Sequence, residues 1–153
     1  MLNALRDFIK SLSGDHEPKK HFDETDVRLA LAALLAHAMS IDGADDEAER
    51  AKMRAVLEEE YQIAGDDLDV LIDEAIKADG EAVDLYGFTS ILKRNMELEQ
   101  RLRVVEHLWE MVYADGKVHE FEDNLVWRIA ELLGVESRDR IARRAQVAAR
   151  TES

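Results

Sequence analysis

Residues 29–40 read LALAALLAHAMS, and this stretch decides the fold class. All of its side chains except His37 and Ser40 are apolar, so the segment has no polar face to turn toward water. A helix that is apolar all round is buried in the middle of a protein. We therefore expect this segment to be the central helix of an all-helical domain, with Asp23 as its cap.

The rest of the chain also carries helical patterns. The chain of 153 residues has one proline and seven glycines, which leaves little room for a strand-and-turn architecture. No stretch alternates polar and apolar residues for long enough to predict a strand. We predict a single all-α domain of about seven core helices in two pseudo-repeated halves. The expected helices after the central one cover residues 46–62, 67–78, a segment after Asp84, 97–114, 119–133 and a segment after Ser137.

Glycines and aromatic residues give finer expectations. Gly80 and Gly134 are expected to end helices, as glycine often does. Leu98 and Trp109 share the apolar stripe of the helix at 97–114, and Trp127 falls at helical spacing in the next one. We expect all three of these side chains in the core.

The N-terminal residues form a separate unit. Residues 1–12 place five apolar side chains on one helical face, which predicts an amphipathic helix (Leu2, Leu5, Phe8, Ile9 and Leu12). Residues 13–21, SGDHEPKKH, contain no apolar residue and are expected to be a linker. The helical domain is expected over residues 22–150. Packing on this domain, or on a partner, is the expected role of the N-terminal helix.

Charge limits the classes of partner. The formal net charge is −14, and residues 42–74 hold thirteen acidic and three basic side chains. Such a surface repels phosphate backbones and anionic lipids, so nucleic acid is not an expected ligand. A cation or a basic protein partner, which the sequence does not identify, is favoured. The five arginines in residues 137–150 are expected to dock on the acidic first half of the chain.

No segment is long and apolar enough to predict a membrane span or a signal peptide, so we expect a cytoplasmic protein. Cysteine is absent, which excludes thiolate chemistry and cysteine metal sites. Neither a nucleophile elbow nor a phosphate-binding loop is present. The sequence therefore predicts a protein that is not an enzyme.

Two stretches of the chain are alike. AMSIDGADDEAERAKMRAVL and MVYADGKVHEFEDNLVWRIA align without gaps when Asp42 is matched with Asp115, an offset of 73 residues. Glu49 then meets Glu122, and apolar positions also correspond. We interpret this as an internal duplication, with repeat units of about 27–62 and 98–134.

The repeated carboxylates are candidate metal ligands. Asp42 and Asp115 each extend the apolar face of a helix at its C-terminus, where the helix dipole is already negative. A half-buried carboxylate there needs a donor or a cation. If the repeats pack as a pair, Asp42, Glu49, Asp115 and Glu122 form an all-oxygen cluster. Such a cluster suits calcium, magnesium or manganese, and zinc less well.

Simpler roles compete with metal binding. Asp46 and His119 stand three residues before Glu49 and Glu122, so each glutamate can close a capping box. Asp-Gly is also an ordinary turn signal. Two other functions therefore stay open beside cation binding: a metal-free helical interaction module, and a hydrolase that uses carboxylate-bound metal to activate water.

At these residues the sequence resembles the tellurite-resistance TerB family, in particular its stand-alone bacterial branch. The resemblance covers residues 22–149 and rests on Asp42-Gly43, on Ala114-Asp115-Gly116, each with glutamate seven positions after the aspartate, and on VDLYGFTSIL. It implies an all-helical fold of two similar halves and an association with tellurite and other stress responses. It also implies divalent cation binding at the four matched carboxylates.

Overall fold

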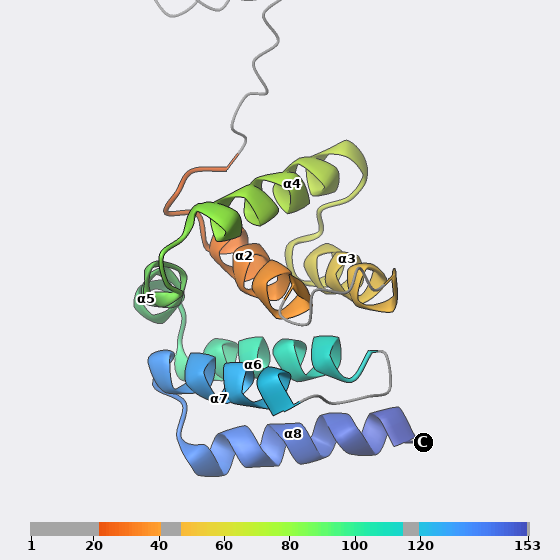
Figure 1. The fold of residues 1–153 in the computed structure, drawn as a ribbon, viewed down its shortest axis with the longest axis vertical. Helices are drawn as coiled ribbons and strands as arrows, with labels where there is room; N and C mark the ends of the chain where they lie inside the picture. Colours follow the sequence, from red (N-terminus) through yellow and green to blue (C-terminus); the bar gives the residue numbers. More distant parts are fainter. Residues whose placement is uncertain (1–21, 41–46, 115–119, 153) are drawn as a thin grey trace, which may run out of the picture.

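The chain forms an all-α domain. The structure, a computed structural model, describes residues 22–40, 47–114 and 120–152. These residues contain seven helices and no strand, which confirms the predicted fold class (Figure 1). The helices are α2 (Val27–Ser40), α3 (Glu47–Tyr61), α4 (Gly65–Glu81), α5 (Tyr86–Asn95), α6 (Leu98–Val112), α7 (Glu120–Leu132) and α8 (Ser137–Glu152).

Helix α2 is the centre of the domain, as its sequence predicts. Every residue from Leu29 to Ala36 is at most 4% exposed. The helix contacts α3, α4, α5 and α6, and Figure 1 shows it enclosed between α4 and α6. Because four helices bury residues 29–36, this part of the segment has no need of a polar face.

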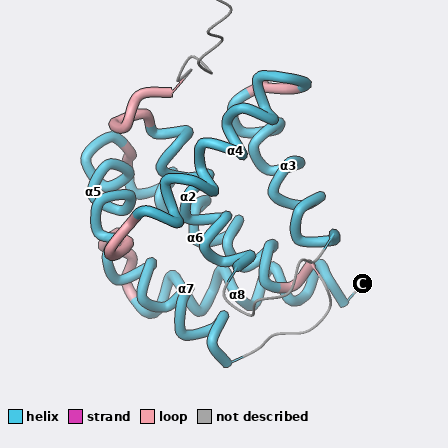
Figure 2. Tube along the Cα trace, turned by 45° about the horizontal axis from the view of Figure 1, so that its top comes forward, coloured by secondary structure: helices cyan, strands magenta, loops and turns pink. Residues whose placement is uncertain are grey.

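The second half of the chain builds the other layer. Helices α7 and α8 both pack on α6, and Figure 2, like Figure 1, shows α6 between α2 and α8. Helix α6 begins with a capping box. The Glu97 backbone N–H donates to Gln100 Oε1 at 2.9 Å, and the Glu97 side chain accepts the backbone N–H of Gln100. One continuous apolar core joins residues of both halves, which makes the helices a single domain.

Helix positions and burial repeat with the offset seen in the sequence. Helices α3 and α7 begin at Glu47 and Glu120, which are 73 residues apart. Matched apolar pairs are buried in both halves, and each member is at most 8% exposed: Leu35 with Leu108, Met39 with Val112, Met53 with Val126, and Val56 with Ile129. The two stretches therefore occupy equivalent places in the core.

Some expected boundaries are wrong. Asp26, and not Asp23, caps α2: its Oδ1 accepts the Arg28 backbone N–H at 2.8 Å, while Asp23 closes a turn with Thr25. Helix α4 runs through Gly80 to Glu81. A glycine within a helix costs about 1 kcal/mol, which the packing of α4 on α2 outweighs. The predicted helix at 1–12 and linker at 13–21 lie outside the described residues.

Gly134 ends α7 as predicted, and it requires glycine. Its φ is +73°, and an added Cβ would meet Arg101 Nη1 at 3.1 Å, the atom that donates to the Leu133 carbonyl at 2.6 Å. We expect Gly134→Ala to lower the free energy of unfolding by about 1–2 kcal/mol. Gly80→Ala, with open space around its Cβ, is expected to raise it by about 0.5–1 kcal/mol. Urea unfolding of both variants checks this pair, and a Gly134→Ala variant as stable as the parent would contradict it.

Candidate functional site

The two repeated glutamates are buried at equivalent places. Glu49 is 2% and Glu122 is 1% exposed, and each lies in the first turn of its helix, α3 or α7. Both helices pack on α6, the hub of the second layer. Burying an ionised carboxylate is costly unless hydrogen bonds or cations compensate. The structure therefore sets these two acids apart from the exposed Glu47 at the start of α3.

The other two predicted ligands, Asp42 and Asp115, lie outside the described residues. So do Asp46 and His119, the partners of the glutamates in the capping-box alternative. Within the described ranges, no group of three or more His, Asp or Glu side chains is disposed to hold a metal ion. Convergence of the four carboxylates thus stays a prediction, and so does capping.

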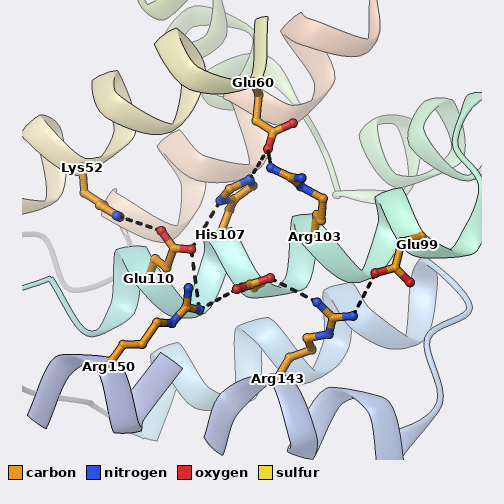
Figure 3. Close-up of polar contacts among 9 residues, drawn as sticks. Lys52, Glu60, Glu99, Arg103, His107, Glu110, Arg143 and Arg150 are labelled. Carbon is orange, nitrogen blue, oxygen red and sulfur yellow. Dashed lines mark hydrogen bonds and ion pairs between the residues drawn. The ribbon is translucent and has the colours of Figure 1, made fainter. Parts of the chain in front are cut away.

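A network of charged side chains on α6 was not predicted. At its centre lies His107, whose side chain is 8% exposed. Its Nε2 lies 2.8 Å from Glu60 Oε1 of α3, and its Nδ1 lies 3.6 Å from Glu110 Oε1 (Figure 3). Arg103 binds the same Glu60 oxygen, and Lys52 Nζ lies 2.7 Å from Glu110 Oε2. These contacts join α3 to α6 by charge.

The network holds its members ionised. Burial disfavours the charged imidazole, but the Glu110 and Glu60 carboxylates outweigh it and raise the pKa of His107 above 6.5. The His107 ring, helped by the Lys52 ammonium, lowers the pKa of Glu110 to about 2. The ring is enclosed and ion-paired on both sides, so its role is to join helices and not to meet a substrate.

The arginine-rich helix α8 docks by charge, but on α6 rather than on the acidic first half. Arg143 lies 3.2 Å from Glu106 and 3.1 Å from Glu99, and Arg150 also binds Glu106 (Figure 3). The prediction was right about intramolecular docking and wrong about its place. Glu99, Glu106 and Glu110 are seven and four residues apart and so align along one face of α6, which gives α8 a nearer partner than residues 42–74.

A second histidine faces a hollow between α2, α4 and α7. His37 Nδ1 lies 2.8 Å from Asp79 Oδ1, and this contact raises the pKa of His37 despite its partial burial. The hollow has a volume of about 680 Å³, and Asn124 and Arg128 also line it. A carboxylate-oriented imidazole is suited to proton transfer. Among the described residues that line this hollow, none is a serine, threonine or cysteine that could act as a nucleophile.

The sequence held part of the signal for these pairs. Arg103, His107 and Glu110 are four and three residues apart, a spacing that brings side chains together on a helix. Glu60 and Asp79 lie 47 and 42 residues from their histidines, and only the packing of separate helices shows those contacts. None of the described helices is both long and apolar enough to cross a bilayer.

Comparison with known proteins identifies the family. The sequence model of the family described as Tellurite resistance protein TerB matches residues 28–145, which is most of the chain. No curated protein and no solved structure matches it. The match covers both repeat units, and with them the buried Glu49 and Glu122. The chain therefore belongs to the TerB family.

Proposed function

We propose that this protein is a non-enzymatic, stress-associated member of its family that binds one divalent cation between its two acidic repeats. It acts in the cytoplasm and presents its acidic surface to a basic partner. The observation that carries the proposal is the burial of Glu49 and Glu122 at equivalent repeat positions, on two helices that pack on the same neighbour. Calcium, magnesium or manganese suits such oxygen ligands better than zinc does.

The proposal needs Asp42 and Asp115 to complete the ligand set. Each stands seven residues before its glutamate, between the end of one described helix and the start of the next. Loops at helix ends supply both carboxylate and backbone carbonyl oxygens, as cation sites require. Two carboxylates from each repeat carry four negative charges, and a divalent cation among them would offset half of that charge and reduce their mutual repulsion.

Calorimetric titration of chelator-treated protein with calcium, magnesium, manganese and zinc tests the proposal. We expect saturable binding of about one ion per chain for at least one of the first three, lost in Asp42→Asn/Asp115→Asn. Glu49→Gln/Glu122→Gln is expected to weaken binding by at least about tenfold. The matched control is Glu47→Gln, an exposed residue in the first turn of α3, which should bind as the parent does.

The glutamine variants also separate cation binding from capping. Glutamine closes a capping box as well as glutamate does, so a purely capping role predicts unchanged behaviour. A parent protein that binds none of the four ions would overturn the proposal. Equal binding by the parent and the Glu49→Gln/Glu122→Gln variant would remove these glutamates from the site.

A metal-free interaction module is the second candidate, and the segment between α4 and α5 favours it. Val83 is fully exposed and Tyr86 is 65% exposed, at a point where two hollows adjoin. Exposed apolar side chains of this kind mark contact sites. Survival of tellurite-treated cells separates the candidates. The module predicts that Val83→Asp/Tyr86→Ser loses protection while Asp115→Asn keeps it; cation binding predicts the reverse.

A further inference from the structure

A groove runs along α4 on the side where the described chain begins. Its volume is about 780 Å³. Six residues of α4 line it at positions that fall on one helical face: Val70, Asp73, Glu74, Lys77, Ala78 and Glu81. The core contacts of α4 come from a different face, with Leu68, Leu71 and Ala75 fully buried. Helix α4 therefore has a second face that no described helix covers completely.

The groove suits an amphipathic helix of limited length. Leu29 and Ile91, which are 4% and 9% exposed, and the half-buried Phe88 form its floor from α2 and α5, and acidic residues surround it. From Val70 to Glu81 the axis of α4 rises about 16 Å. A groove with an apolar floor and charged margins is the usual binding site for an amphipathic helix, which binds through its apolar face.

We propose that residues 2–12 of the same chain occupy this groove as a helix. Eleven helical residues span about 16 Å, the length of the α4 face. The apolar positions of this segment recur at helical spacing, with Leu5 and Phe8 at the centre. Arg6 and Lys10 lie beside that apolar face, and residues 1–21 carry a formal charge of +1 in a chain of −14. The groove has five acidic side chains and one lysine.

Chain connectivity favours this occupant over a separate partner. Figure 1 shows the segment before α2 beside the C-terminal end of α4, and Glu24 of this segment lines the groove. Nine residues, 13–21, connect it to the amphipathic stretch. A flexible linker of that length has a root-mean-square span of about 16 Å and gives an effective concentration in the millimolar range. A helix from a separate molecule would have to be present at a millimolar concentration to compete equally with the tethered segment for the groove.

Paramagnetic relaxation enhancement in NMR tests the proposal. The chain has no cysteine, so Asn3→Cys on the polar face of the segment takes a single nitroxide label. We expect strong broadening of the Val70, Lys77 and Phe88 amides and none along α8. Uniform weak broadening, or none, would overturn the proposal. Broadening that appears only between labelled and unlabelled molecules in a mixture would assign the groove to a second copy instead.

Matched variants separate docking from folding. Gly87 lines the groove, and an added Cβ there meets nothing within 4 Å. Gly87→Trp is therefore expected to fill the groove and abolish the broadening, with helical circular dichroism unchanged. The control is Gly80→Trp, which has equal space and lies outside both hollows, and it should keep the broadening. In the segment itself, Leu5→Asp/Phe8→Asp should abolish the broadening, whereas the control Asp7→Ser should keep it. Broadening that persists in both of these variants would contradict the proposal.

Discussion

Trp109→Ala is expected to lower the free energy of unfolding by about 3–5 kcal/mol, the range for removing a large aromatic side chain from a core. Trp109 is 1% exposed and is the largest fully buried side chain of the described chain. Its ring lies 6.2 Å from that of Tyr113, and the Arg144 guanidinium stacks 4.9 Å from its centre. The substitution therefore also removes one of the contacts between α8 and α6, beside the ion pairs of Arg143 and Arg150.

The other tryptophan is the matched control. Trp127 is 42% exposed, and its ring is covered by Arg140 of α8 at 5.4 Å. Trp127→Ala is expected to cost about 1 kcal/mol or less, because the cavity it leaves is open to water. Urea unfolding followed by circular dichroism measures both variants. Similar losses of unfolding free energy in the two variants would show that burial does not determine how much each tryptophan contributes to stability.

His107→Ala is expected to cost about 3 kcal/mol near pH 6, because it leaves Glu60 and Glu110 facing each other without the imidazolium. Lys52 and Arg103 still neutralise part of that charge, as does Arg150, which lies 4.0 Å from Glu110. Removing His37 is expected to cost about 1 kcal/mol or less, since its ring is 35% exposed beside Asp79.

The pH dependence of stability has a definite sign. Because folding raises the pKa of His107, its contribution is complete below about pH 6.5 and is lost as the pH rises through the folded-state pKa. Glu110 acts at the other end: its contribution is complete above about pH 4.5 and is lost as the pH falls toward 2. Urea unfolding from acid to mildly alkaline pH should show both losses in the parent. A His107→Gln variant with the same alkaline decline would refute this assignment.

Helix type and order could be predicted because apolar spacing in this chain is regular. The exact ends could not, since they depend on neighbours. Gly134 stops α7 because its backbone adopts a positive φ, whereas Gly80 stays helical because α4 packs along α2. Likewise Leu98 lies on the predicted apolar stripe of α6 but is 47% exposed, because it falls in the first turn, beyond the cover of the neighbouring helices.

The candidate site was predictable in part for a similar reason. The internal repeat matches Glu49 with Glu122, but it also matches Glu47 with Glu120, and only the burial of Glu49 separates it from the exposed Glu47. Nothing in the order of residues pairs His107 with Glu60, because that contact arises where two helices from different halves cross. The docking of α8 shows the same limit. The charge of its arginines predicted that it docks on an acidic part of the chain, but the packing of the helices determines that this part is α6.

The central position of α2 has a consequence during synthesis. Its segment is made early, yet its cover includes α6, which is complete only at Val112. At about 5–20 residues per second, the ribosome needs roughly 4–14 s to add the 72 residues between Ser40 and Val112. During that interval a nearly uncharged stretch of leucine and alanine remains without its native neighbours. The nascent chain is therefore most open to chaperones, and to aggregation, before its second repeat has emerged.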